Sequence, residues 1–183
     1  MRGRLILGVA LGLASLFIGT SVSADDPKPK KDNHAHNRAG KSALDPFKAL
    51  AGDWVGQMED SGQKIDCTVN YKVTSNGTAV VETLGPGTPH EMVGIIHEDG
   101  EGLALTHYCA IGNQPRMKTD AKPGPHKFAF KFTGASNLAS DKDMHMHDVV
   151  FELVDKDTVR VVWTNYNEGK PAGTAVLALK RKK

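Results

Sequence analysis

The chain has 183 residues, with 23 basic and 21 acidic side chains. Residues 1–24 hold two of the basic residues and none of the acidic ones, so residues 25–183 carry 21 of each. A surface this close to neutral offers no basic patch for a polyanion, which argues against nucleic acid as a partner.

The N-terminal residues follow the order of a secretory signal peptide. Arg2 and Arg4 precede an uncharged apolar stretch from Leu5 to Ile18, and small residues lead up to Ala24. A secretory signal peptide has a basic N-terminus, a short apolar stretch and small residues before its cleavage site. The run is short for a bilayer span. We therefore predict removal of the signal peptide, a periplasmic or secreted location and no membrane span after cleavage.

The remainder divides into a leader and one domain. Residues 25–43 are dense in charge, proline and glycine and contain no aliphatic run, so they are predicted to be a disordered leader. Residues 44–183 have the length of a single domain, which can bury a sizeable core.

One short helix and then only strand patterns are expected in this domain. Asp45 is suited to cap a helix, Pro46 suits its first position, and Gly52 can close it. Runs with alternating polarity then recur between glycine, proline and asparagine turns, which favours an antiparallel meander. We place strands near 52–60, 64–74, 78–84, 90–97, 103–110, 126–132, 144–154, 157–166 and 172–180. The predicted fold class is all-β, a meander closed into a barrel that hides its edges, with a short N-terminal helix.

Alternation along these runs assigns side chains to the two faces of the sheet. The apolar face of 64–74 carries Ile65, Cys67, Val69, Tyr71 and Val73, and that of 103–110 carries Leu103, Leu105, His107 and Cys109. The apolar faces of the later runs hold Phe128, Phe130, Phe132, His145, His147, Val149, Phe151, Leu153, Val159, Val161, Trp163 and Asn165. Buried polar groups need partners, so the histidines, Tyr71 and Asn165 either satisfy one another or line a cavity for a ligand.

The sequence resembles lipocalin-like barrels of the calycin superfamily, in which a short helix precedes a G-x-W motif, here Gly52-Asp53-Trp54. The resemblance implies that Trp54 plugs one end of the barrel, with Arg160 or Arg181 as its cover. It is closest to a group of uncharacterised secreted bacterial lipocalin-like proteins, on residues 73–83, 89–92, 106–109, 112–117 and 145–147. This group implies a fold and a compartment but no activity.

A more distant likeness is to the nitrobindins, which bind haem. Gly52, Trp54 and Gly56 fit their first strand, but Gln57, Met58 and Glu59 stand where further glycines are expected. The last strand also lacks a histidine for the iron, so haem would need His145 or His147 instead. The sequence identifies no cofactor.

Three other groupings could carry chemistry. His145 and His147 lie on one face roughly 7 Å apart, and with His107 they could hold a metal ion, joined by Cys109 if the strands meet. Cys67 and Cys109 share the inward parity, so one disulfide is possible in an exported chain. Glu82, His90 and Glu91 could supply acid or base chemistry, but no spacing marks them as a pair.

The function that these patterns favour is an exported binding protein holding a small, largely apolar ligand inside the barrel. Its predicted ligand-binding residues are Tyr71, His107, Cys109, Arg116, His145, His147 and Trp163, with Arg116 in a loop at the mouth. The alternatives are a metal or haem protein that uses the same histidines, an enzyme acting in the same cavity, and a structural or interaction module.

Overall fold

The computed structural model describes residues 42–183, so the predicted signal peptide and residues 25–41 of the predicted leader lie outside the described residues. Ser42 and Ala43 both hydrogen-bond to the Glu98 carboxylate, at 2.7 and 3.1 Å. The folded part of the described chain therefore includes these two residues as well. No helix among residues 42–183 has the length and apolar character needed to cross a lipid bilayer.

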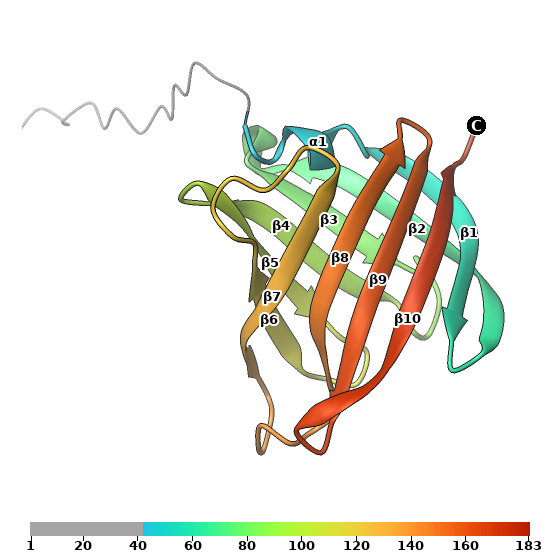
Figure 1. Cartoon of the computed structure of the whole chain (residues 1–183). Helices are drawn as coiled ribbons and strands as arrows, with labels where there is room; N and C mark the ends of the chain where they lie inside the picture. Colours follow the sequence, from blue (N-terminus) through green and yellow to red (C-terminus); the bar gives the residue numbers. More distant parts are fainter. Residues whose placement is uncertain (1–41) are drawn as a thin grey trace, which may run out of the picture. The chain divides into compact units, whose positions relative to one another are not determined.

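The described residues form a closed antiparallel β-barrel (Figure 1). Each strand pairs with the next along the chain, and the first strand pairs with the last. The predicted all-β barrel with a short N-terminal helix is confirmed. The elements are α1 (Asp45–Lys48), β1 (Gly52–Asp60), β2 (Gln63–Thr74), the 3-10 turn η1 (Ser75–Gly77), β3 (Ala79–Leu84), β4 (Met92–Asp99), β5 (Gly102–Tyr108), β6 (Gln114–Lys118), β7 (Lys127–Ser136), β8 (His145–Asp155), β9 (Thr158–Asn167) and β10 (Lys170–Arg181).

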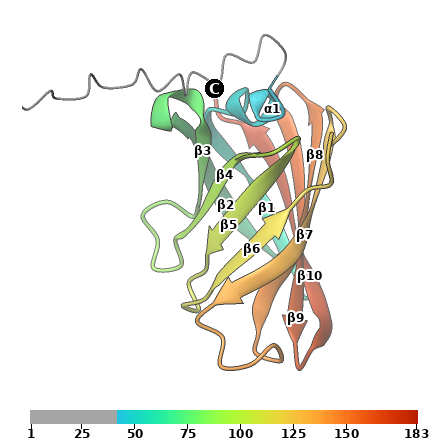
Figure 2. The ribbon, with the colours of Figure 1, turned by 90° about the vertical axis from the view of Figure 1, so that its left-hand side faces the viewer.

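The helix α1 closes one end of the barrel (Figures 1 and 2). Its Phe47 is fully buried and meets the rings of Phe128 and Phe151 edge-on, at centroid distances of 4.8 and 5.2 Å. Leu44 and Leu50 are buried with it. Because this end is filled with apolar side chains, a molecule entering the barrel would have to come from the opposite end.

Trp54 and Arg181 hold α1 against the barrel. The Trp54 indole donates a hydrogen bond to the Leu50 carbonyl at 2.8 Å, and the Arg181 guanidinium lies 4.5 Å above the Trp54 ring. Arg181 also donates to the carbonyls of Ala49 and Ala51, at 2.8 and 2.9 Å. The expected plug and its cover are thus present, with Arg181 in that role.

Arg181→Ala is expected to lower the free energy of unfolding by about 2 kcal/mol. It removes a cation–π contact, hydrogen bonds to the carbonyls of Ala49, Ala51 and Lys156, and an ion pair with Asp157. Arg160→Ala is the matched control, since Arg160 only pairs with Glu152 on the surface at 2.9 Å. That change is expected to cost less than about 1 kcal/mol. Urea unfolding of both variants checks this, and equal losses would contradict it.

Two sequence expectations about the strands are wrong. Residues 114–118, placed in a loop, form the short strand β6, which pairs with β5 only through 116–118. Pro115 has no N–H to donate, but it lies outside the part of β6 that pairs with β5, so no hydrogen bond to β5 is lost. Ile65 was expected to face the core but is 51% exposed. Its end of β2 extends beyond β3, whose pairing with β2 reaches only to Val69 and Leu84, so no opposite wall covers it.

Candidate functional site

A row of four inward-facing residues crosses neighbouring strands in the barrel interior. The register pairs Tyr71 of β2 with Glu82 of β3, Glu82 with Gly94 of β4, and Gly94 with His107 of β5. Directly opposed residues in an antiparallel sheet have their side chains on the same face, so the three polar side chains share one wall. We call Tyr71, Glu82, Gly94 and His107 the buried polar row.

Gly94 makes room for the carboxylate of Glu82. A Cβ atom at position 94 would lie 3.0 Å from Glu82 Oε2 and 3.2 Å from Leu105 Cδ1. Both distances are shorter than ordinary contacts between carbon and its neighbours. The glycine therefore lets the acid occupy the space between β3 and β5.

Glu82 is a fully buried acid, 0% exposed, without a basic partner. The Tyr71 hydroxyl donates to its Oε1 at 2.8 Å, whereas Oε2 has no hydrogen-bond partner among the described residues. Burial raises the pKa of Glu82 to about 7, and the hydrogen bond from Tyr71 opposes this rise. A carboxyl group with such a pKa can hold or release a proton near neutrality.

His107 is equally buried and carries two unpaired nitrogens. Its ring packs against Trp163 of β9 with a centroid distance of 4.7 Å. Neither Nδ1 nor Nε2 has a hydrogen-bond partner within residues 42–183. Burial lowers the pKa of His107 to about 4, so the ring is neutral and offers one donor and one acceptor.

A pocket of about 770 Å³ lies beside the buried polar row, away from α1. Its lining combines inward-facing residues, outward-facing residues of β1 and β2, and residues of the β3–β4 loop. These are Gly56, Met58, Ile65, Cys67, Leu84, Met92 and Leu177, then Val55, Gln57, Asp66 and Thr68, and then Gly85, Thr88 and His90. Leu84 and Met92 each lie two residues along the same face from Glu82 and Gly94, a step of about 7 Å. Met92 is the more adaptable of the two, because its unbranched chain changes conformation easily. The pocket therefore ends one layer of side chains from the Glu82 carboxylate.

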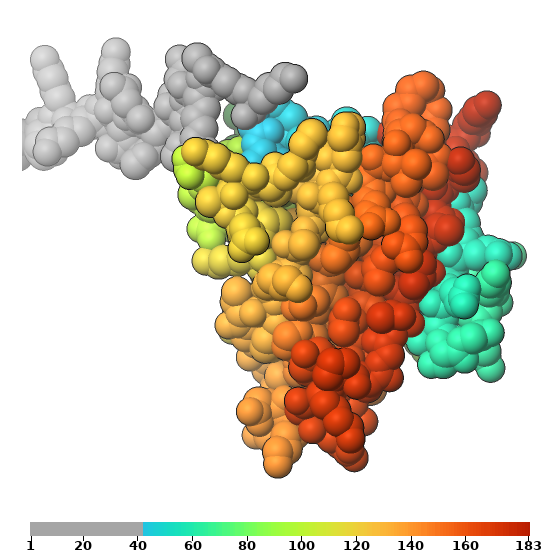
Figure 3. Space-filling view, viewed as in Figure 1, coloured from blue at the N-terminus to red at the C-terminus, as the bar shows by residue number. Residues whose placement is uncertain are grey.

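The face of the barrel formed by β8, β9 and β10 and the α1 end are both closed. Figure 3 shows the outer surface of β8, β9 and β10 as a continuous face without an opening. The α1 end is filled by Phe47 and Trp54, both 0% exposed.

More polar atoms without partners lie near the opposite end from α1. The Asn113 side-chain amide donates to the Met144 carbonyl at 2.8 Å, while its Oδ1 is buried and unpaired in the described chain. His145 Nδ1 donates to the Asp143 carbonyl at 2.7 Å, and its Nε2 is likewise unpaired. Asn165, two residues beyond Trp163 on β9, has an unpaired Oδ1. Buried polar atoms without partners therefore also lie outside the buried polar row.

His145 is buried, 3% exposed, but neither it nor His147 lies beside His107 as expected, because β8 has a β-bulge between Met146 and Asp148. The β8–β9 register shifts by one residue between Met146 and Asp148, so strict alternation ends there. The rings of the two histidines pack against each other and against Phe132 and Tyr166. His147 stacks on Tyr166 at 3.6 Å and on Phe132 at 4.5 Å, and the two histidine rings lie 5.4 Å apart.

Accordingly, the predicted three-histidine metal site is not assembled. Among residues 42–183, no group of three or more His, Cys, Asp or Glu side chains is arranged to hold a metal ion. His107 packs on Trp163, whereas His145 and His147 belong to the separate ring cluster with Phe132 and Tyr166.

The predicted disulfide is also not formed, and both thiols are free. β3 and β4 separate the strand of Cys67 from that of Cys109. Three strand spacings amount to about 14 Å, well beyond the ~7 Å that a bridge tolerates between Cα atoms. Instead, Cys67 lines the pocket and the Cys109 sulfur lies 3.8 Å from that of Met92.

Arg116 does not lie in a loop at the mouth. It sits on β6 with its side chain exposed, and it donates to the Ser136 hydroxyl at 2.8 Å. Its strand neighbours Pro115 and Met117 are buried, so the arginine faces outward by alternation. Of the predicted ligand-binding residues, the structure brings together Tyr71, His107 and Trp163 in the interior, with Cys109 beside the pocket.

Sequence reasoning named Glu82 only as a possible acid or base, and it did not place this residue in the barrel interior. A signal was present: it alternates with Val80 and Leu84 in a predicted strand, so it lies on an apolar face. Gly94 carries no comparable signal, because only the register shows that it stands between Glu82 and His107.

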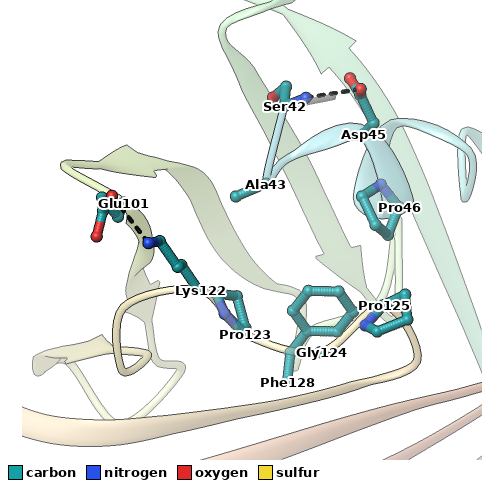
Figure 4. A pocket seen from close by; sticks show the side chains of 10 residues that line it. All are labelled: Ser42, Ala43, Asp45, Pro46, Glu101, Lys122, Pro123, Gly124, Pro125 and Phe128. Atoms are coloured by element: carbon teal, nitrogen blue, oxygen red, sulfur yellow. Dashed lines mark hydrogen bonds and ion pairs between the residues drawn. The ribbon is translucent and has the colours of Figure 1, made fainter. Parts of the chain in front are cut away.

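A second pocket, of about 830 Å³, lies outside the barrel at the α1 end (Figure 4). Prolines and Phe128 form its apolar lining. Its polar side chains have partners: the Asp45 carboxylate accepts from the Ser42 backbone amide at 2.9 Å and from Lys48 at 3.1 Å, and the Lys122 ammonium lies 3.5 Å from the Glu101 carboxylate. It therefore lacks the unsatisfied buried atoms that distinguish the barrel interior.

Comparisons with known proteins gave no match to a family model or a curated protein, but they gave a similar solved structure. A solved structure of a protein of unknown function from the DUF3598 family of Nostoc punctiforme is similar, with 12% identity and a TM-score of 0.49. The match covers 74% of this chain and 49% of that one, so the chain spans about half the length of that protein.

Proposed function

We propose that this chain is an exported binding protein that holds a small, largely apolar molecule inside its barrel. The apolar body of the ligand occupies the pocket lined by Met58, Leu84 and Met92, and its polar group reaches Glu82 and His107. Export rests on the signal-peptide pattern of residues 1–24. Kinship with lipocalin-like barrels is part of the proposal, and the packing of Trp54 beneath Arg181 supports it.

This proposal rests on the atoms of the buried polar row that have no hydrogen-bond partner. Glu82 Oε2 and both nitrogens of His107 are buried without partners in the described chain. Each such atom costs about 1–3 kcal/mol compared with a satisfied or apolar group. A barrel that needed only to fold would be more stable with apolar residues in these places. A ligand that supplies the missing hydrogen bonds accounts for their presence.

Trp163 offers a direct test, because its ring contacts His107 and the chain has only one other tryptophan, Trp54. In the variant Trp54→Phe, titration with 1-octanol is expected to change the emission of Trp163 and to saturate. Met92→Phe, which fills the pocket, should weaken binding about tenfold or more, equivalent to 1.4 kcal/mol. His97→Phe, at an exposed position on the same strand, is the matched control and should leave binding unchanged.

The absence of a saturable change in Trp163 emission would overturn the proposal. Equal weakening by Met92→Phe and His97→Phe would also contradict it, because the pocket would then not be the route to Trp163.

A further inference from the structure

Building on the proposed function, we propose that the polar group of the ligand is a protonated amine, held by the carboxylate of Glu82. The interior of the barrel is therefore a site for small amphiphilic amines. The argument rests on the charges that face the buried polar row, on the free oxygen of Glu82 and on the aromatic surroundings.

The interior holds an acid but no base to neutralise it. Glu82 is the only buried Asp or Glu of the described chain. Every Lys and Arg within residues 42–183 is at least partly exposed, and His107 is neutral at physiological pH. Buried charges in proteins are normally paired, because an isolated one is costly to remove from water. A cationic ligand supplies the missing partner of Glu82.

The hydrogen-bonding atoms of the row also suit an ammonium group. The Tyr71 hydroxyl already occupies Oε1 of Glu82, so Oε2 is left to accept a bond. A neutral His107 offers a second acceptor nitrogen. An ammonium has three N–H donors, so it can donate to Oε2 and still has donors left for a further acceptor. The aromatic rings of Tyr71 and Trp163 favour a positive charge nearby.

The other common polar groups of small apolar molecules fit less well. A carboxylate would face the Glu82 carboxylate with no buried Lys or Arg to bridge them, and like charges at close range repel. An alcohol can bond to Oε2 but leaves the negative charge unpaired. The expected order of affinity is thus amine, then alcohol, then carboxylate.

The proposal implies that binding strengthens as Glu82 loses its proton. The other titratable side chains on this face are Tyr71 and Cys67 of β2, His107 of β5 and Cys109 after it. Burial raises the pKa of Tyr71 and of Cys67, and it lowers that of His107 to about 4. Glu82, with a pKa of about 7, gains its charge between pH 6 and 8.

The test compares octylamine, 1-octanol and octanoate on the purified full chain by isothermal titration calorimetry. At pH 8 octylamine is expected to bind at least about tenfold more tightly than octanol, a difference equivalent to 1.4 kcal/mol. Its affinity should fall about tenfold at pH 6, because only about a tenth of Glu82 is then ionised while the amine stays protonated. Glu82→Gln keeps the shape of the side chain and should abolish both the amine preference and the pH dependence.

The outcomes separate this inference from the proposed function. Octanoate binding most tightly, or an amine preference that survives in Glu82→Gln, would overturn the amine assignment while leaving the barrel as a binding site. If none of the three compounds binds, the proposed function itself fails. The pH series on the wild-type chain keeps the test independent of how well Glu82→Gln folds.

Discussion

Replacing Gly56 by alanine is expected to destabilise the barrel severely. Gly56 lies on β1, which pairs with β10 to close the sheet. A Cβ atom at this position would stand 1.9 Å from the Ala178 carbonyl oxygen and 2.9 Å from its carbon, and both are backbone atoms that cannot swing away. The closing pair of strands would have to separate locally. We expect a loss at or above the upper end of the ~1–3 kcal/mol typical of overpacked sites, measured by urea unfolding.

Gly124→Ala is the matched control for this experiment. The added Cβ at position 124 meets no atom within 4 Å, and the residue lies in the loop between β6 and β7. Its free energy of unfolding should change by no more than about 0.5 kcal/mol. A Gly56→Ala protein as stable as Gly124→Ala would show that β1 and β10 do not pack as closely as described.

The variant Glu82→Gln is expected to become increasingly stable relative to the wild type as the pH rises. The folded protein raises the pKa of Glu82 from 4.5 to about 7 because the group is buried. The folded state therefore holds the proton more tightly than the unfolded state, so the contribution of Glu82 is fully present below pH 4.5. It is lost as the pH rises through 7. Over this window the wild type should lose about 3 kcal/mol relative to the glutamine variant.

Urea unfolding of both proteins at pH 4.5, 6, 7 and 8 measures this difference. His107 titrates in an overlapping range with the opposite sign, since burial lowers its pKa to about 4 and its contribution is lost as the pH falls. Subtracting the two proteins at each pH removes this effect, because both retain His107. A difference between them that stays constant with pH would contradict the burial of an ionisable Glu82.

Four of the strands have ends close to those that the sequence predicts. Residues 52–60 were placed without error at either end, and 64–74, 144–154 and 157–166 came within a residue. β6 was missed because Gln114, Pro115, Arg116 and Lys118 have low strand preference and its pairing with β5 is brief. Alternation also fails wherever a strand gains a residue, and the bulge at 146–148 carries no sign in the sequence.

The sequence by itself determined an all-β meander, a short helix before Trp54 and the inward direction of Tyr71, His107 and Trp163, because these follow from local alternation and turn residues. Only the tertiary structure decided which strands stand side by side and in what register. Closure of the barrel aligned Glu82, Gly94 and His107 in one row, kept Cys67 and Cys109 apart, and turned Arg116 outward. Register depends on the packing of the whole sheet, and a shift of one residue reverses every side chain. The site could therefore be resolved only once the sheet had closed.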